Sequence, residues 1–245
     1  MTTNKHVRVV AALTAMSVSA CASGADAHQA RKSTTGNTDA PVALVTTAAI
    51  TQAALPAGAV RFLVAPSGNA ARFRVREQLL GHDLPNDAVG ETQQITGAIT
   101  VDSKGALVAG QSLFVVQVTS LKSDSDRRDG YVQHRLLETD KYPTVELVPT
   151  AIRGLVTVPS AASAVGPVTV DVVGNLTVRG VTHPTTWRVT ARQANGQVTG
   201  SASTKFTFAD FAINPPKVPV LLSVADTIAL EYDFTLTRDT LASRH

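Results

Sequence analysis

The sequence predicts an all-β protein in which about eight antiparallel strands close into one barrel, with a short helix near one mouth. Segments of alternating polarity recur over residues 60–237, with turn signals between them. Val, Thr and Ala are abundant, while aromatic residues make up only 4% of the chain, which favours β-branched strands. Closing such strands into a barrel removes the exposed edges that invite aggregation.

Individual strands show a period of two. Residues 71–77 place Phe73 and Val75 on one face and three arginines on the other, which indicates a strand with one buried side. Residues 95–102 and 107–119 flank a Ser-Lys-Gly turn signal and are predicted to form a hairpin. Further strands are predicted at residues 144–152, 168–179, 185–192, 197–208 and 227–237.

The last predicted strand has the clearest alternation. Its apolar face carries Ile228, Leu230, Tyr232, Phe234 and Leu236, and its other face is acidic or threonine-rich. One stretch breaks the strand pattern. Residues 123–130 are polar and lead into residues 131–139, which predicts a loop and a short helix across one barrel end.

Residues 1–20 have the features of a signal peptide. A short basic region is followed by an apolar run that is too short to span a bilayer, which takes about 20 apolar residues. The protein is therefore expected to be exported. Loss of this leader removes Lys5 and Arg8 from 22 basic residues, against 19 acidic ones, so the mature chain is nearly neutral. With no long basic cluster, nucleic acid is not an expected partner.

Cys21, the single cysteine, follows Val-Ser-Ala, which resembles a bacterial lipobox in which the cysteine is acylated and becomes the new N-terminus. The predicted protein is then a lipoprotein held at a membrane of the cell envelope. An alternative is cleavage after Ala27, which discards Cys21 and gives a secreted soluble protein. Both interpretations leave the barrel without a disulfide.

The predicted organisation has three parts: a signal peptide at residues 1–20, Cys21 with a flexible tether at residues 21–55, and a barrel domain at residues 56–240. The tether is rich in Ala, Thr, Ser and Gly and lacks aromatic residues. Residues 41–50 are more apolar, and an alternative is that they dock on the barrel as a strand or helix.

No catalytic constellation is evident. His82, His134 and His183 are the histidines of the barrel segment, and none shows the spacing of a helical zinc pair. The serines lack the setting of a hydrolase nucleophile, and the glycines form no phosphate loop. We therefore predict no enzyme activity, no cofactor and no metal. A hydrolase that uses His134 or His183 is the enzymatic alternative.

Two blocks of sequence resemble the YceI-like family. Residues 120–129 (SLKSDSDRRD) with residues 136–143 (LLETDKYP) form the first block, and residues 174–184 (GNLTVRGVTHP) form the second. The blocks stand in the family's order, and the resemblance covers residues 60–237. It implies an extended, lipocalin-like, eight-stranded antiparallel barrel with a hydrophobic tunnel that holds a polyisoprenoid or another long-chain amphiphile.

Such a tunnel would bind lipid by removing apolar surface from water, at about 25 cal/mol per Å². The expected wall residues are aromatic or aliphatic and lie on inward strand faces: Phe73, Phe114, Val116, Val118, Leu176, Trp187, Phe206, Phe208, Tyr232 and Phe234. The alternative is that the same residues fill a solid core.

A diphosphate or quinone head group would need hydrogen-bond donors at the mouth, and arginine binds phosphate oxygens well. The basic candidates near the two blocks are Arg127, Arg128, His134, Arg135, Arg179 and His183. An alternative for Arg128 is a local salt bridge with Asp129 that fixes the loop.

This chain departs from the plainest family pattern in its lipobox and tether, in residues 77–92, which we interpret as a longer loop, and in three prolines within residues 210–219. Mouth loops decide which ligand fits, so the lipid is not identified. The sequence favours a lipid carrier or reservoir in the cell envelope. The alternative is a tethered envelope or stress-response scaffold with a packed barrel. Whether the barrel forms a homodimer is left open.

Overall fold

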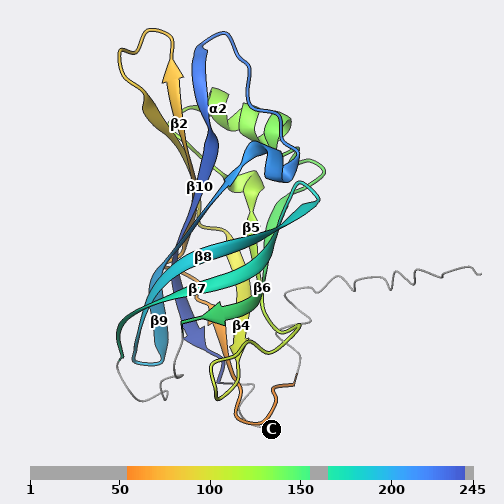
Figure 1. Ribbon diagram of the computed structural model, residues 1–245, viewed down its shortest axis with the longest axis vertical. Coiled ribbons are helices and arrows are strands. Elements are labelled where there is room, and N and C mark those ends of the chain that lie inside the picture. The colour runs from red at the N-terminus through yellow and green to blue at the C-terminus, as the bar shows by residue number, and fades with distance from the viewer. Residues whose placement is uncertain (1–53, 155–164, 241–245) are drawn as a thin grey trace, which may run out of the picture. The chain divides into compact units, whose positions relative to one another are not determined.

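The computed structural model describes residues 54–154 and 165–240, and the predicted leader, Cys21 and tether lie outside these ranges. The described residues form an antiparallel β-barrel (Figure 1). Its strands are β1 (Val60–Val64), β2 (Ala70–Leu79), β3 (Asn86–Thr92), β4 (Ile95–Val101), β5 (Leu113–Gln117), β6 (Thr144–Arg153), β7 (Val165–Val178), β8 (Val181–Ala194), β9 (Gln197–Thr207) and β10 (Leu221–Arg238).

The barrel closes through β10, which is long enough to pair with two strands along one edge. Its first half pairs with β2, as in Leu230 opposite Phe73, and its last residues pair with β1, as in Leu63 opposite Thr237. On its other edge, β2 pairs with β3, and β1 pairs with β4. The strand segments therefore make an eight-stranded closed barrel, as the sequence predicted.

The break between β1 and β2 is fixed by one buried asparagine. The amide nitrogen of Asn69 donates to the carbonyl of Ala65 at 2.8 Å, and its oxygen accepts from the backbone of Thr235 at 3.0 Å and from the hydroxyl of Tyr232 at 3.1 Å. Gly68 has φ of 81°, and a side chain there would meet Thr235. This break lets one edge of β10 serve both β1 and β2.

The predicted hairpin of β4 and β5 is confirmed, with Ile95 opposite Val116, but the second strand is shorter than expected. Residues 102–112 form turns, including the predicted turn at Gly105, which has φ of 83°. Strand structure begins only at Leu113.

The interpretation of residues 77–92 as a loop was wrong. β2 continues to Leu79, and β3 returns beside it, with Phe73 opposite Gly90 and Val75 opposite Ala88. The inward residues Ala88 and Gly90 are small, and at Gly90 the ring of Phe73 leaves no room for a side chain, since a Cβ atom would approach it to 2.2 Å. Without large apolar residues, β3 shows no hydrophobic alternation in the sequence.

A short helix lies near one end of the barrel, as predicted. α2 (Asp126–Tyr131) continues into the π-helical turn η2 (Val132–Leu136), and both lie at the upper end of the barrel in Figure 1. Ser125 caps α2 by accepting from the backbone of Arg128. Short 3-10 turns occur at η1 (Val118–Ser120) and η3 (Phe208–Phe211).

The opposite end of the barrel holds a buried ion pair. The guanidinium of Arg61 is fully buried and lies 3.6 Å from the carboxylate of Asp239. The same guanidinium donates to the side chain of Gln111 at 3.2 Å. These contacts join β1, the β4–β5 loop and the end of β10, so this end is tied together by polar contacts.

Candidate functional site

The interior of the barrel contains an apolar cavity of about 280 Å³. One water needs only about 10–15 Å³ measured in the same way, so the cavity has room for a sizeable guest. All ten wall residues that the sequence suggested line it: Phe73, Phe114, Val116, Val118, Leu176, Trp187, Phe206, Phe208, Tyr232 and Phe234. The barrel interior is therefore not a fully packed core.

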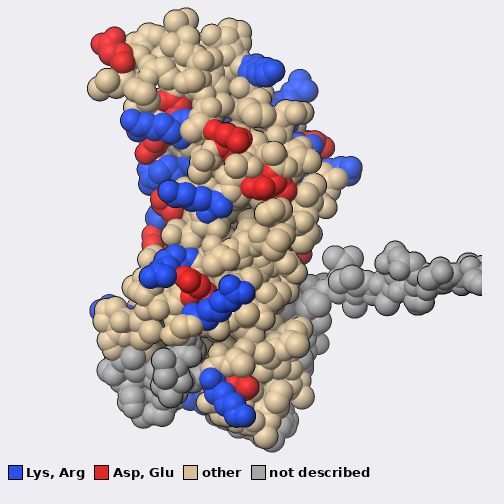
Figure 2. Space-filling model, in the orientation of Figure 1, with Lys and Arg blue, Asp and Glu red and all other residues tan. Residues whose placement is uncertain are grey.

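The alternation of β10 and β2 sends apolar residues inward and charged residues outward. Leu230, Tyr232 and Phe234 line the cavity. On the outer face Arg72 lies 2.5 Å from Glu91 and 2.5 Å from Asp233. The hydrogen bond with Asp233 raises the pKa of Arg72 above its ordinary value. Blue and red side chains lie close together on this side of the molecule in Figure 2.

A second pair continues this outer ladder. Arg74 lies 3.1 Å from Glu231, and this hydrogen bond raises the pKa of Arg74. Asp87 on β3 lies 3.1 Å from Arg76. The charges of these strands are therefore neutralised outside the barrel, away from the apolar interior.

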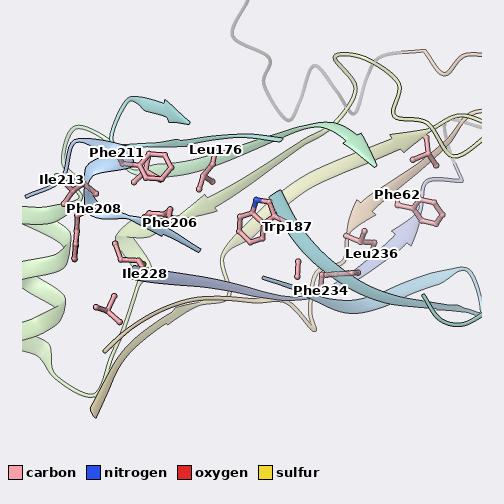
Figure 3. Packing of buried hydrophobic residues seen from close by; sticks show 14 residues of the cluster. Phe62, Leu176, Trp187, Phe206, Phe208, Phe211, Ile213, Ile228, Phe234 and Leu236 are labelled. Carbon is pink, nitrogen blue, oxygen red and sulfur yellow. The ribbon is translucent and has the colours of Figure 1, made fainter. Parts of the chain in front are cut away.

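Two aromatic side chains of the cavity wall, Trp187 and Tyr232, carry polar atoms, and protein groups form hydrogen bonds with these atoms. The indole nitrogen of Trp187 donates to the hydroxyl of Thr185 at 3.0 Å. Burial raises the pKa of Tyr232, whose phenol stays neutral and donates to Asn69. Trp187 lies between Phe206 and Phe234 in Figure 3. The rings therefore present apolar surface to the cavity.

The helical end covers one end of the cavity. Val132, Leu136 and Leu137 line it from η2 and the residue after it, and Ile213 lines it from the loop that follows η3. Figure 3 shows Ile213 and Phe208 beside this helix. The loop before α2 is fixed by Asp129, which accepts from the hydroxyl of Ser123 at 2.6 Å.

A buried acidic residue lies in the cavity wall at this end. Glu77 is only 9% exposed, and its carboxylate accepts from the guanidinium of Arg128 at 2.7 Å. Burial alone would lower the pKa of Arg128, but attraction to Glu77 and hydrogen bonding raise it. Arg128 also pairs with Asp124. The amide of Asn86 donates to Glu77 at 3.4 Å, while its oxygen is buried without a partner.

The alternative of a local salt bridge for Arg128 holds with Asp124 and not with Asp129. Arg128 pairs with Glu77 on β2, and Asp129 lies 3.5 Å from Lys122. Sequence reasoning missed Glu77 and Asn86, although Glu77 continues the inward series of Phe73 and Val75. A carboxylate at an inward position of an otherwise apolar face is the signal that could have found it.

The six basic candidates do not line the cavity. Arg127 and Arg135 are exposed on the helical segment. His134 lies 3.3 Å from Asp140, and Arg179 lies 3.3 Å from Glu138. Four of the six candidates, Arg128, His134, Arg179 and His183, thus lie within 4 Å of an acidic side chain.

His183 lies near the start of β8, beside η3. Its Nε2 lies 3.6 Å from Asp210, and its Nδ1 is buried without a hydrogen-bond partner. Hydrogen bonds from the backbone and hydroxyl of Thr207 lower the pKa of Asp210. His183 therefore faces the η3 turn, where its ring meets Phe211 edge to face.

Among residues 54–154 and 165–240, no three His, Cys, Asp or Glu side chains gather in a way that could hold a metal ion. In the same part of the chain, no helix has the length and hydropathy needed to cross a membrane.

Comparison with known proteins identifies one family and several solved structures of similar fold. A family model described as a YceI-like domain matches residues 62–236. A polyisoprenoid binding domain from Saccharophagus degradans, implicated in plant cell wall breakdown, superposes with a TM-score of 0.51 at 13% identity, covering 73% of this chain and 98% of that one. BcnA of Burkholderia cenocepacia gives 0.52 at 17% identity, covering 70% and 98%. No curated protein matches the chain. At these identities the solved structures establish similarity of fold.

Proposed function

Since this chain belongs to the YceI-like family, we propose that it binds a long-chain amphiphilic lipid, polyisoprenoid or quinone-like, inside its barrel and serves as a carrier or reservoir in the cell envelope. The observation that carries this proposal is the apolar cavity of about 280 Å³ around Trp187. The fold similarity to a polyisoprenoid binding domain agrees with it.

The driving force would be burial of the lipid chain. Apolar surface removed from water contributes about 25 cal/mol per Å², and the cavity offers aliphatic and aromatic side chains from most strands of the barrel. Because Trp187 and Tyr232 satisfy their polar atoms within the protein, the guest does not have to supply hydrogen bonds along its length. The cavity is then expected to select its lipid guest by the length and width of the apolar chain.

The charges at the helical end favour an uncharged head group. Glu77 is a buried carboxylate of the wall, and its partner Arg128 already binds two acidic side chains. A diphosphate close to Glu77 would be repelled, whereas a hydroxyl or carbonyl would not. We therefore favour a polyprenol or quinone. Arg127 and Arg135 are the exposed cations that a phosphate could reach from outside.

Catalysis is not needed for this role, and the proposal includes none. The wall is built almost wholly of carbon-rich side chains, and Glu77, the buried acid in it, is held in an ion pair. The scaffold alternative requires a packed interior, and the cavity speaks against it.

Export and anchoring complete the proposal. The leader and the lipobox-like sequence before Cys21 support attachment at the outer face of a membrane through an acylated cysteine. A barrel tethered in this way would remain close to a bilayer, the natural source of its guest.

Trp187, the single tryptophan, offers a direct test. A lipid brominated along its chain quenches indole fluorescence on contact, so we expect saturable quenching of Trp187 as a brominated prenol or fatty alcohol is added. An aqueous quencher such as iodide should reach the ring less well when the cavity is filled. If the brominated lipid leaves the emission unchanged while the protein is folded, the proposal fails.

A further inference from the structure

Four large apolar side chains are exposed to solvent at one end of the barrel. Leu80 is 63% exposed and Leu84 77%, both in the turn between β2 and β3. Val220 is 42% exposed and Leu222 60%, both where the chain enters β10. Contiguous exposed apolar surface of this kind marks interaction sites with proteins or membranes.

The two turns form one surface. The backbone N–H of Leu80 donates to the carbonyl of Val220 at 2.9 Å, and Leu79 pairs with Leu221. Both turns project from the end of the barrel near α2 (Figure 1), and the top of the view in Figure 2 is largely uncharged. We call the exposed side chains of Leu80, Leu84, Val220 and Leu222 the apolar rim.

Several backbone groups of these turns already have hydrogen-bond partners within the protein, which lowers the cost of moving the turns out of water. The carbonyls of Leu79 and Val218 accept backbone N–H groups at 3.2 and 2.9 Å, and the side chain of Gln78 donates to the carbonyl of His82 at 2.5 Å. Four nearby residues have no N–H to satisfy: Pro85, Pro215, Pro216 and Pro219. These contacts and the prolines reduce the number of backbone donors that the two turns would expose to the interfacial region of a bilayer.

The charges beside the rim set the depth of insertion. Asp83 is exposed next to Leu84, and Lys217 is exposed in the other turn. A charged carboxylate is costly within hydrocarbon, so the rim fits the level of the lipid head groups rather than the bilayer core. Lys217 at that level would be attracted by anionic phospholipids.

The rim adjoins the cavity. Pro216 and Val224 line the cavity from the chain segment that carries Val220 and Leu222, and Glu77 lines it from the strand that leads to Leu80. We infer that the apolar rim docks on a lipid bilayer and places this end of the cavity at the membrane surface, where a lipid guest can enter or leave. Docking itself depends only on the rim; the exchange of a guest rests on the proposed function.

The test is flotation of the mature chain, residues 21–245 without the leader, with vesicles of phosphatidylethanolamine and phosphatidylglycerol. Cys21→Ala is present throughout, so that no acyl chain at that position contributes. The protein with the unaltered apolar rim is expected to float with the vesicles. Combined Leu84→Glu and Leu222→Glu should reduce the bound fraction by about tenfold or more, because each exposed leucine loses its apolar contact. Ala106→Glu combined with Ala109→Glu, both exposed in the β4–β5 loop, adds the same two charges elsewhere and should change nothing.

Quenching of Trp187 by a brominated alcohol, added without vesicles, separates the two proposals. Retained quenching in the rim variant together with lost flotation supports a docking face distinct from the cavity. Flotation that the rim variant keeps, or that the unaltered rim never shows, overturns the docking face even if the cavity binds lipid. The protein with the unaltered rim could instead self-associate in analytical ultracentrifugation without binding vesicles. If the rim variant abolishes this self-association, the docking face is overturned in favour of a contact between copies of the chain.

Discussion

Replacement of Ala202 by Phe is expected to weaken lipid binding in the cavity strongly. Ala202 is buried on β9, lines the cavity, and stands between Val189 and Tyr232 in the sheet. A benzyl group there would occupy the space beside Tyr232 that a lipid chain needs. We expect the apparent Kd for a brominated alcohol, measured by quenching of Trp187, to rise by about a hundredfold, equivalent to about 2.7 kcal/mol.

The neighbouring residue supplies the matched control. Ser203 is exposed on the outer face of the same strand, so Ser203→Phe adds the same group outside the barrel. It should leave the Kd unchanged. Because Ala202→Phe fills existing space, it should also unfold no more easily than the parent protein. Equal affinity of the Ala202→Phe and parent proteins would show that the lipid binds elsewhere.

Arg128→Ala is expected to destabilise the barrel by about 3 kcal/mol, because it leaves the buried carboxylate of Glu77 without its partner. The two side chains are only 16% and 10% exposed, so solvent cannot replace the lost contact fully. The value is at the low end of the range for buried pairs because both groups keep some access to water. Denaturant unfolding followed by Trp187 fluorescence would measure it.

Two further variants identify the cause of that loss. Glu77→Gln combined with Arg128→Ala removes the uncompensated charge and should recover a large part of the lost free energy. Arg127→Ala removes an exposed cation from the same helix and should change stability by about 0.5 kcal/mol or less. A cost for Arg127→Ala equal to that for Arg128→Ala would contradict the role assigned to the Glu77 pair.

The fold was accessible from the sequence where large apolar residues alternate. On β10 every second residue from Ile228 to Leu236 lines the cavity, so the period alone identified its buried face. The polar run before α2 stood out for the opposite reason, since it interrupts the alternation and then supplies a Ser cap. The two family blocks indicated which barrel these strands form.

β3 could not be found by the same reasoning. Its inward positions include Ala88 and Gly90, and Gly90 has no room for a side chain because Phe73 from β2 lies over it. The size of a residue on one strand is thus decided by a side chain of its neighbour. A single sequence does not show that dependence until the register is known.

The partners of the ion pairs at the barrel mouth could not be predicted from the sequence either. Arg128 and Asp129 are adjacent in sequence, yet on a helix neighbouring side chains point in different directions. Arg128 reaches Glu77 on β2, and Asp129 reaches Ser123 and Lys122. The strand period indicated the inward faces, although Val118 and Phe208 lie in the 3-10 turns η1 and η3 and not on strands as predicted. The charge partners depended on the packing of α2 against the barrel, which the period does not show.

Mass spectrometry of an organic extract would test the central claim, that a long-chain lipid occupies the cavity. The full chain would be produced in an exporting host and purified without detergent, beside its Ala202→Phe variant. The account predicts a stoichiometric long-chain species with an uncharged head group in the parent protein and its loss from the variant. A clean extract from the folded parent protein that also takes up no added prenyl lipid would contradict it.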